Sequence, residues 1–138
     1  MNRADLQRLA DLRIDEARLL LDSRAYPGAY YLAGYSVECA LKACIARQIR
    51  EFDFPEKRFV ERTHTHNLAQ LMELSGVKVL FDEAAAAQES LQVNWTIVRK
   101  WSEASRYSVS TDEQSAQDLI AAVGDETNGV LPWLKNHW

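Results

Sequence analysis

The hydrophobic positions of the chain are densest between residues 29 and 49, in the run AYYLAGYSVECALKACIARQI. Wound as a helix, this run is apolar on almost every side, which predicts a helix buried among neighbouring elements. Pro27 suits the first turn of a helix, so we expect the helix to begin near residues 26–28. Small residues such as Ala33 and Gly34 leave room for other helices to lie close. We therefore interpret this segment as the central helix of a bundle.

Two further helices are predicted on either side of the central helix in the sequence. Residues 2–23 carry an apolar stripe at helical spacing, made of Leu6, Ala10, Ile14, Ala17 and Leu21. Thr63 or Thr65 offers an N-cap hydroxyl for a short helix, and Gly76 supplies the usual left-handed stop. We expect the first helix to pack its stripe against the central one.

The second half of the chain predicts two more helices. Residues 82–101 read as one long helix, preceded by a connection or a helical lead-in at residues 77–81. Two overlapping capping-box patterns place the start of the last helix near Thr111. Pro132 should kink or end that helix near Asn128, because proline removes a backbone donor and clashes with the preceding turn.

The remaining segment, residues 51–59, contains Pro55 and three phenylalanines, so we expect a loop pinned to the bundle by aromatic side chains. No segment alternates apolar and polar residues as a half-buried strand would. The predicted fold is therefore all-α, an antiparallel up-and-down bundle of four long helices and one short helix. A chain of 138 residues favours one domain, spanning residues 1–138.

The net charge and the cysteine positions narrow the range of possible functions. The formal net charge of -4 argues against broad, sequence-blind nucleic-acid binding, which needs a basic stripe, but leaves room for a local nucleotide or RNA phosphate site. Cys39 and Cys44 stand five positions apart on one helix and cannot bridge each other, which suits a reducing cytoplasm. Glu38 and Lys42 interrupt the apolar run and argue against a membrane span.

Glu38 and Lys42 are also candidates for a site. They are spaced i,i+4 with the acid first, the favourable order on a helix. A buried carboxylate is costly unless paired, so we expect Glu38 to meet Lys42, Arg106 or a tyrosine hydroxyl. One hypothesis is a polar cleft whose lining and ligand-binding residues are Glu38, Lys42, Arg106 and Tyr107. The alternative makes Arg106 a structural partner of Glu38 or of a helix C-terminus.

Three motifs carry a family resemblance. YYLAGYSVECALKA (residues 30–43), THTHNLAQLM (63–72) and WSEASRY (101–107) stand in the order found in HEPN domains of bacteria and archaea, which the chain resembles. The resemblance implies a small all-helical protein. In HEPN ribonucleases an arginine at the place of Arg106 is followed, after four to six residues, by a histidine that works with it on the phosphodiester. Here those positions hold Thr111, Asp112 and Glu113, so the histidine is missing.

Two functions follow from this resemblance. The first is a non-catalytic binding and interaction module, which could bind a nucleotide and pair with a small nucleotidyltransferase in a toxin-antitoxin or stress system. The alternative is a divergent RNA-cleaving enzyme that uses Arg106 with an unusual partner. The missing histidine and the acidic charge favour the first.

The histidines of the chain suggest little chemistry by themselves. Arg58 and His64 match the arginine-histidine spacing, but chance gives about 0.7 such matches in a chain of this composition, and the pair lies in the wrong loop for the family. Thr65 and His66 are interpreted as structural residues that organise the start of the short helix. No metal site is predicted, because a lone His-x-His has no further ligand at suitable spacing. No cofactor is expected.

Leu12 and Leu19 fall i,i+7 on a second face of the first helix, among charged residues. Scattered exposed leucines are ordinary in soluble proteins. Two on one face could equally serve a contact between copies, and the resemblance to HEPN domains, which usually pair, favours a two-fold homodimer.

Overall fold

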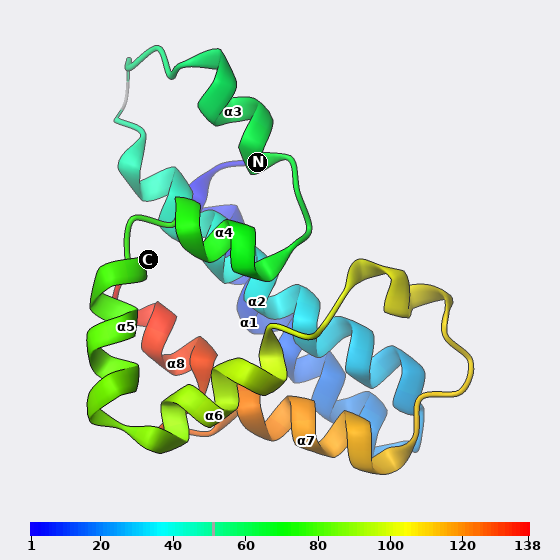
Figure 1. The fold of residues 1–138 in the computed structure, drawn as a ribbon. Coiled ribbons are helices and arrows are strands. Elements are labelled where there is room, and N and C mark those ends of the chain that lie inside the picture. Colours follow the sequence, from blue (N-terminus) through cyan, green and yellow to red (C-terminus); the bar gives the residue numbers. More distant parts are fainter. Residues whose placement is uncertain (51) are drawn as a thin grey trace.

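The computed structural model describes residues 1–50 and 52–138, and within them the secondary structure is helical, without a strand (Figure 1). The α-helices, in chain order, are α1 (Arg3–Asp22), α2 (Tyr26–Gln48), α3 (Lys57–Thr63), α4 (Leu68–Leu74), α5 (Lys78–Ala87), α6 (Glu89–Val98), α7 (Glu113–Gly124) and α8 (Val130–Lys135), and a 3₁₀ helix, η1 (Glu103–Tyr107), lies between α6 and α7. The all-α helical bundle predicted from the sequence is confirmed.

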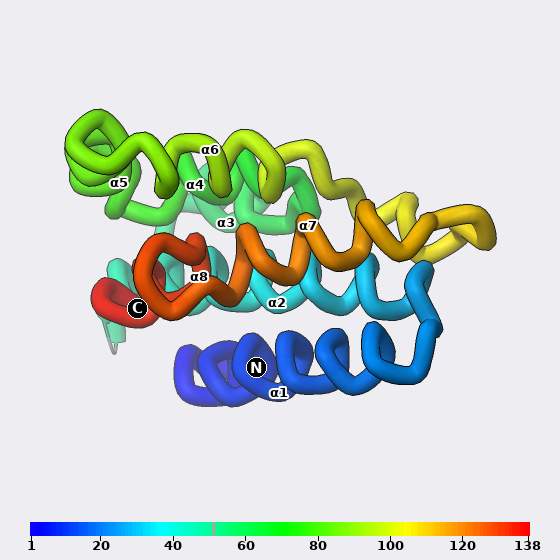
Figure 2. Tube along the Cα trace, turned by 90° about the horizontal axis from the view of Figure 1, so that it is seen from below, coloured from blue at the N-terminus to red at the C-terminus, as the bar shows by residue number. Residues whose placement is uncertain are grey.

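The first two helices form an antiparallel pair along the molecule (Figures 1 and 2). The side chain of Asn2 accepts a hydrogen bond from the Asp5 backbone at 2.9 Å, and the Asp5 carboxylate accepts one from the Asn2 backbone, which completes a capping box at the start of α1. The chain turns into α2 through Arg24, which has a positive φ of 61°. Farther along, the Ser36 hydroxyl donates to the carbonyl of Ala10 at 2.7 Å and ties the two helices together.

Helix α2 occupies the centre, as its all-round hydrophobicity predicts. Figure 2 shows it between α1 on one side and the layer of α4, α5 and α6 on the other, with α7 alongside. Five consecutive residues, Val37 to Leu41, are all buried, so every face of the helix is covered over this stretch. The helix begins at Tyr26 with Pro27 in its first turn, as predicted.

The long helix expected at residues 82–101 is divided in two, which corrects the sequence-based boundaries. Gln88 has extended backbone angles, φ -132° and ψ 100°, and separates α5 from α6. The break turns α5 back so that Phe81 meets Trp95 of α6 edge-on, with 5.5 Å between ring centroids. Phe81 also packs at 90° against Trp133. A continuous helix would carry Phe81 away from both indoles.

The connection after α2 also differs from expectation. Glu51 lies outside the described residues. Phe52 and Phe54 are 95% and 101% exposed, so they do not pin this segment to the bundle. Phe59 does pack against the core, but as part of α3, a helix that the sequence did not predict. The helix was missed because it buries no residue fully and has no apolar stripe.

Several helix ends are set by residues other than those predicted. Asn67 caps α4 and Asp112 caps α7, each accepting a hydrogen bond from the backbone N–H three residues on. Gly76 has a φ of 78° and ends the α4 segment in the expected left-handed conformation. Helix α7 ends at Gly124, and Pro132 lies in the first turn of α8, where its missing donor is tolerated.

Candidate functional site

A buried carboxylate on α2 forms the base of the site. Glu38 is 2% exposed, and the ammonium group of Lys42, one turn later, donates to its Oε1 at 2.9 Å. This pairing was expected from the spacing. The other carboxylate oxygen, Oε2, is buried and has no hydrogen-bond partner among the described residues. Because an unpaired buried carboxylate is costly, Glu38 depends on the groups that surround it.

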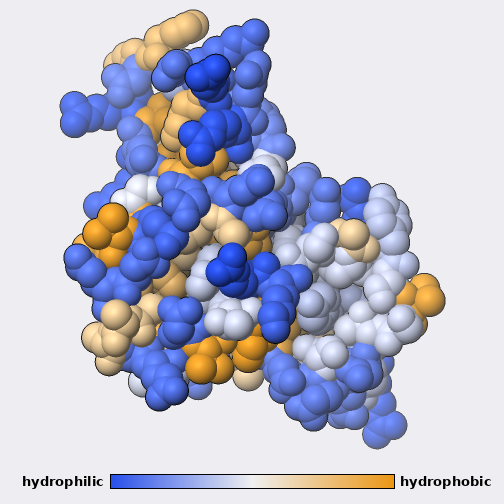
Figure 3. Space-filling model, in the orientation of Figure 1, coloured by the Kyte–Doolittle hydropathy of each residue, from blue (hydrophilic) through white to orange (hydrophobic). Residues whose placement is uncertain are grey.

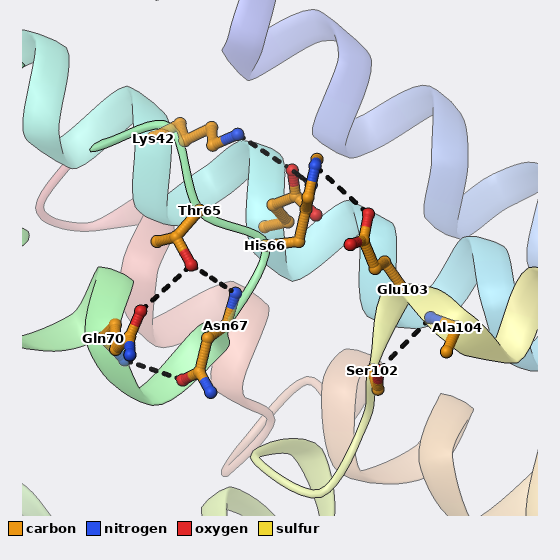
Figure 4. Close-up of polar contacts among 9 residues, drawn as sticks. Lys42, Thr65, His66, Asn67, Gln70, Ser102, Glu103 and Ala104 are labelled. Carbon is orange, nitrogen blue, oxygen red and sulfur yellow. Dashed lines mark hydrogen bonds and ion pairs between the residues drawn. The ribbon is translucent and has the colours of Figure 1, made fainter. Parts of the chain in front are cut away.

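His66 joins this carboxylate to a second one. Its Nδ1 lies 2.9 Å from Glu38 Oε1, and its Nε2 lies 3.1 Å from Glu103 Oε2 (Figure 4). A neutral imidazole has one N–H, so the ring donates to both carboxylates only as the imidazolium. The three residues come from α2, from the loop before α4 and from η1, so His66 connects parts of the chain that are far apart in sequence.

The loop that carries His66 is held by the start of α4. The Thr65 hydroxyl accepts a hydrogen bond from the Asn67 backbone at 3.2 Å and bonds to the Gln70 side chain at 3.0 Å. Asn67 in turn caps the helix through the Gln70 backbone. Figure 4 shows these bonds on the side of the loop opposite the His66 side chain. The Thr65 side chain therefore bonds within this loop and the start of α4, whereas the His66 side chain points to α2 and η1.

A tryptophan places η1 against the bundle. Trp101 is 3% exposed and stacks on Tyr31 of α2, with 6.0 Å between ring centroids. Its indole ring covers Gly34 so closely that a Cβ at that position would lie 2.2 Å from the ring. Ser102 follows and caps η1 by accepting a hydrogen bond from Ala104. The order of these residues in the sequence thus brings Glu103 to His66.

A small hollow lies beside these groups. It has a volume of about 220 Å³ and is lined by Thr65, His66, Asn67, Trp101, Ser102 and Glu103. The Trp101 indole N–H is buried and has no hydrogen-bond partner among the described residues. The lining is polar. Its ionisable groups are the Glu103 carboxylate and the His66 imidazole, whose charges cancel when the ring is protonated.

Arg106 and Tyr107 lie at the end of η1 and face solvent. Tyr107 is 74% exposed, and the Arg106 guanidinium lies over its ring, 4.9 Å from the centroid. Contact with Tyr107 raises the pKa of Arg106, with smaller contributions from Glu103 and Tyr31. Such a pair combines a planar cation with an aromatic face, both of which suit recognition of a partner.

The positions after Arg106 that would hold the family's histidine have structural roles. The Thr111 hydroxyl lies 3.2 Å from that of Ser108. The Asp112 carboxylate caps α7 and its pKa is lowered by hydrogen bonds to Ser115. Glu113 accepts a hydrogen bond from the Gln117 amide. These residues therefore build the turn and the start of α7.

The structure thus brings some of the predicted site residues together and leaves others apart. Glu38 and Lys42 are in contact, but the ion pairs that Glu38 makes in the described part of the chain are with Lys42 and His66, not with Arg106. Arg106 and Tyr107 share η1 with Glu103, which contacts His66 of this cluster. Sequence reasoning missed Glu103, because nothing in its local pattern distinguishes it from other surface acids.

Two absences are found among the described residues. They contain no group of three or more histidine, cysteine, aspartate or glutamate side chains placed to hold a metal ion. None of the helices found in them combines the length and the hydrophobicity needed to cross a membrane.

Comparison with known protein families identifies the class. The family model described as the HEPN domain matches residues 4–125, most of the chain, so this chain belongs to the HEPN domain family. Searches of curated proteins and of solved structures each returned no match.

Proposed function

We propose that this chain is a non-catalytic HEPN-type binding module, acting as one domain over residues 1–138, and that it contacts its partner through Arg106 and Tyr107. The observation that carries the proposal is the exposed Arg106–Tyr107 pair, followed by a turn whose Asp112 carboxylate caps α7. An exposed arginine stacked on an aromatic ring is typical of interaction surfaces. Val109, 93% exposed, extends the same loop with an apolar side chain.

The proposed partner is a small nucleotidyltransferase, in a cytoplasmic toxin-antitoxin or stress system, as family membership suggests. A nucleotide or an RNA phosphate is the other ligand that Arg106 could hold, since its guanidinium is exposed and is not among the ion pairs of the described residues. Glu103 nearby and the acidic turn at Asp112 and Glu113 disfavour a large polyanion. They favour contact with a protein.

Coexpression tests this proposal. The chain would be produced with the nucleotidyltransferase encoded beside it, and the affinity of the purified pair measured by biolayer interferometry. We expect Arg106→Ala to weaken the complex while leaving the melting temperature unchanged, and Arg99→Ala, another exposed arginine, to leave the affinity unchanged. A genome neighbourhood without a nucleotidyltransferase, or equal affinity for both variants, would contradict the proposed partner or contact.

One observation favours the alternative function, an RNA-cleaving enzyme. His66 is distant from Arg106 in sequence, but its Nε2 contacts Glu103 on the same 3₁₀ helix. A histidine therefore does lie beside η1. Against this, both of its ring nitrogens face carboxylates, so neither is free to take a proton from RNA while these contacts persist.

A further inference from the structure

We propose that a compact phosphate-bearing anion binds in a pocket formed by the start of α1 and the end of α2. The open pocket has a volume of about 460 Å³ and is lined by Asn2, Arg3, Ala46, Arg47, Ile49 and Arg50. Three of these six residues are arginines, and none is acidic. The pocket is separate from the Arg106 surface: Gly34, under Trp101, and Arg47 are 13 residues apart on α2, which corresponds to about 20 Å along the helix.

Two of the three guanidinium groups are held in place by main-chain oxygens. Arg3 Nη2 donates to the main-chain oxygen of Trp138 at 3.3 Å, and Arg47 Nη1 donates to that of His137 at 2.7 Å. Since these oxygens belong to consecutive residues, the two guanidinium groups lie close together. Both also lie close enough to Cys44 to act on it electrostatically: burial raises the pKa of this thiol, and the two guanidinium groups partly oppose that rise. Each guanidinium has five N–H donors and uses one here, so the remaining donors are available to a ligand.

The arginine side chains of this pocket form no ion pair with an aspartate or glutamate within the described part of the chain. Seven other lysine and arginine side chains form ion pairs there with aspartate or glutamate, but Arg3, Arg47 and Arg50 do not. Arg3 also stands in the first turn of α1, where the helix dipole disfavours a cation. This local concentration of positive charge, in a protein with a net charge of -4, attracts anions.

The chemistry of the pocket favours a phosphate group. Arginine presents paired N–H donors in a planar fork that matches two phosphate oxygens. Three arginines around one pocket suit a ligand with several charges close together, such as a polyphosphate chain. A nucleic-acid backbone would need a longer basic stripe. The shared chemistry is the polyphosphate chain, which could be free or esterified to a nucleoside.

Isothermal titration calorimetry with sodium triphosphate, at low salt and without divalent cations, tests the site. We expect saturable 1:1 binding that weakens as salt is added. Arg50→Gln should lower the affinity about tenfold or more, as loss of a charge-assisted contact does. The side chain of Arg50 forms no hydrogen bond among those of the described residues, so this variant should keep the melting temperature of the parent. Arg99→Gln removes the same charge from the end of α6 and should leave the affinity within about twofold.

The remaining outcomes also decide the proposal. Tighter binding of ATP than of triphosphate would identify a nucleoside ester, and equal binding would identify the phosphate chain as the recognised group; both support the site. Absence of saturable binding, an equal loss in Arg50→Gln and Arg99→Gln, or displacement of triphosphate by lower concentrations of single-stranded RNA would overturn it. Arg106→Ala should not change this binding, so the result is independent of the proposed function.

Discussion

His66 holds Glu38 and Glu103 on opposite sides of one imidazole ring, with contacts of 2.9 Å and 3.1 Å. Glu38 belongs to the central helix and Glu103 to η1, the 3₁₀ helix that presents Arg106 and Tyr107. Two contacts therefore hold the proposed interaction surface, Arg106 and Tyr107, against the core. One is the His66 bridge, and the other is the packing of Trp101 over Gly34. Each can be tested separately.

Replacing the histidine should loosen η1. Among the ion pairs of the described residues, His66→Ala leaves Glu38 with Lys42 and leaves Glu103 with no partner, so we expect a loss of about 1–3 kcal/mol in unfolding free energy. Urea denaturation measures the change, and amide hydrogen exchange should show faster exchange in η1. His64→Ala, at the end of α3, is the control and should cost less. Equal stability of the two variants would show that the bridge contributes little.

The close contact at Gly34 predicts a steric effect. A methyl group there would lie 2.2 Å from the Trp101 ring, so the indole must move and η1 with it. We expect Gly34→Ala to destabilise the fold by about 1–3 kcal/mol, although alanine normally favours a helix. Gly28→Ala on the same helix is the matched control, because its Cβ would meet only the flexible end of Leu20 at 3.2 Å. Thermal melts of the two variants should differ clearly, and matching melts would contradict the packing.

The buried thiols predict a pH dependence at alkaline pH. Burial raises the pKa of Cys39 and of Cys44 from the ordinary value of 9.0 to about 11. The unfolded chain therefore loses these protons first, and the unfolding free energy should fall as pH rises from about 9 to about 11. Tyr35 should also lower the unfolding free energy at alkaline pH, since burial raises its pKa to about 12. Cys39→Ala/Cys44→Ala should flatten the profile measured by urea denaturation over this window, and an unchanged slope would contradict it.

Two exposed leucines on the outer face of α1 lead us to predict self-association. Leu12 and Leu19 are 50% and 67% exposed, one above the other at i,i+7. Figure 3 shows other hydrophobic surface scattered in small patches among hydrophilic residues on the face drawn there. We expect light scattering to give twice the chain mass of 15.7 kDa, and Leu19→Asp to restore the monomer. Leu80→Asp, at a 49% exposed leucine of α5, should remain dimeric. A monomeric parent protein would contradict the proposed homodimer.

The sequence predicted the central helix well because the signal was strong and local. A run that is apolar on all faces must be buried, and α2 is. The break at Gln88 could not be predicted in the same way, because the helical periodicity continues through it. What divides α5 from α6 is the packing of Phe81 between Trp95 and Trp133, which depends on residues far apart in the chain.

The site was predictable only in part for the same reason. The Glu38–Lys42 pair follows from i,i+4 spacing on one helix, and the structure contains it. The link from Glu38 through His66 to Glu103 joins three separate segments, and no local pattern predicts it. The placement of Arg106 on exposed η1, rather than beside Glu38, likewise depends on how Trp101 packs.

An RNA-cleavage assay tests the claim that this chain is a binding module without its own catalysis. The purified chain would be incubated with an end-labelled RNA in EDTA, beside the Arg106→Ala, Arg99→Ala, His64→Ala and His66→Ala variants. We predict that the RNA stays as intact with the parent chain as without protein, because no histidine follows Arg106 at the family's spacing and both nitrogens of His66 face carboxylates. Cleavage by the parent chain that persists in Arg99→Ala and disappears in Arg106→Ala would contradict the claim, and loss in His66→Ala or His64→Ala would identify the histidine responsible.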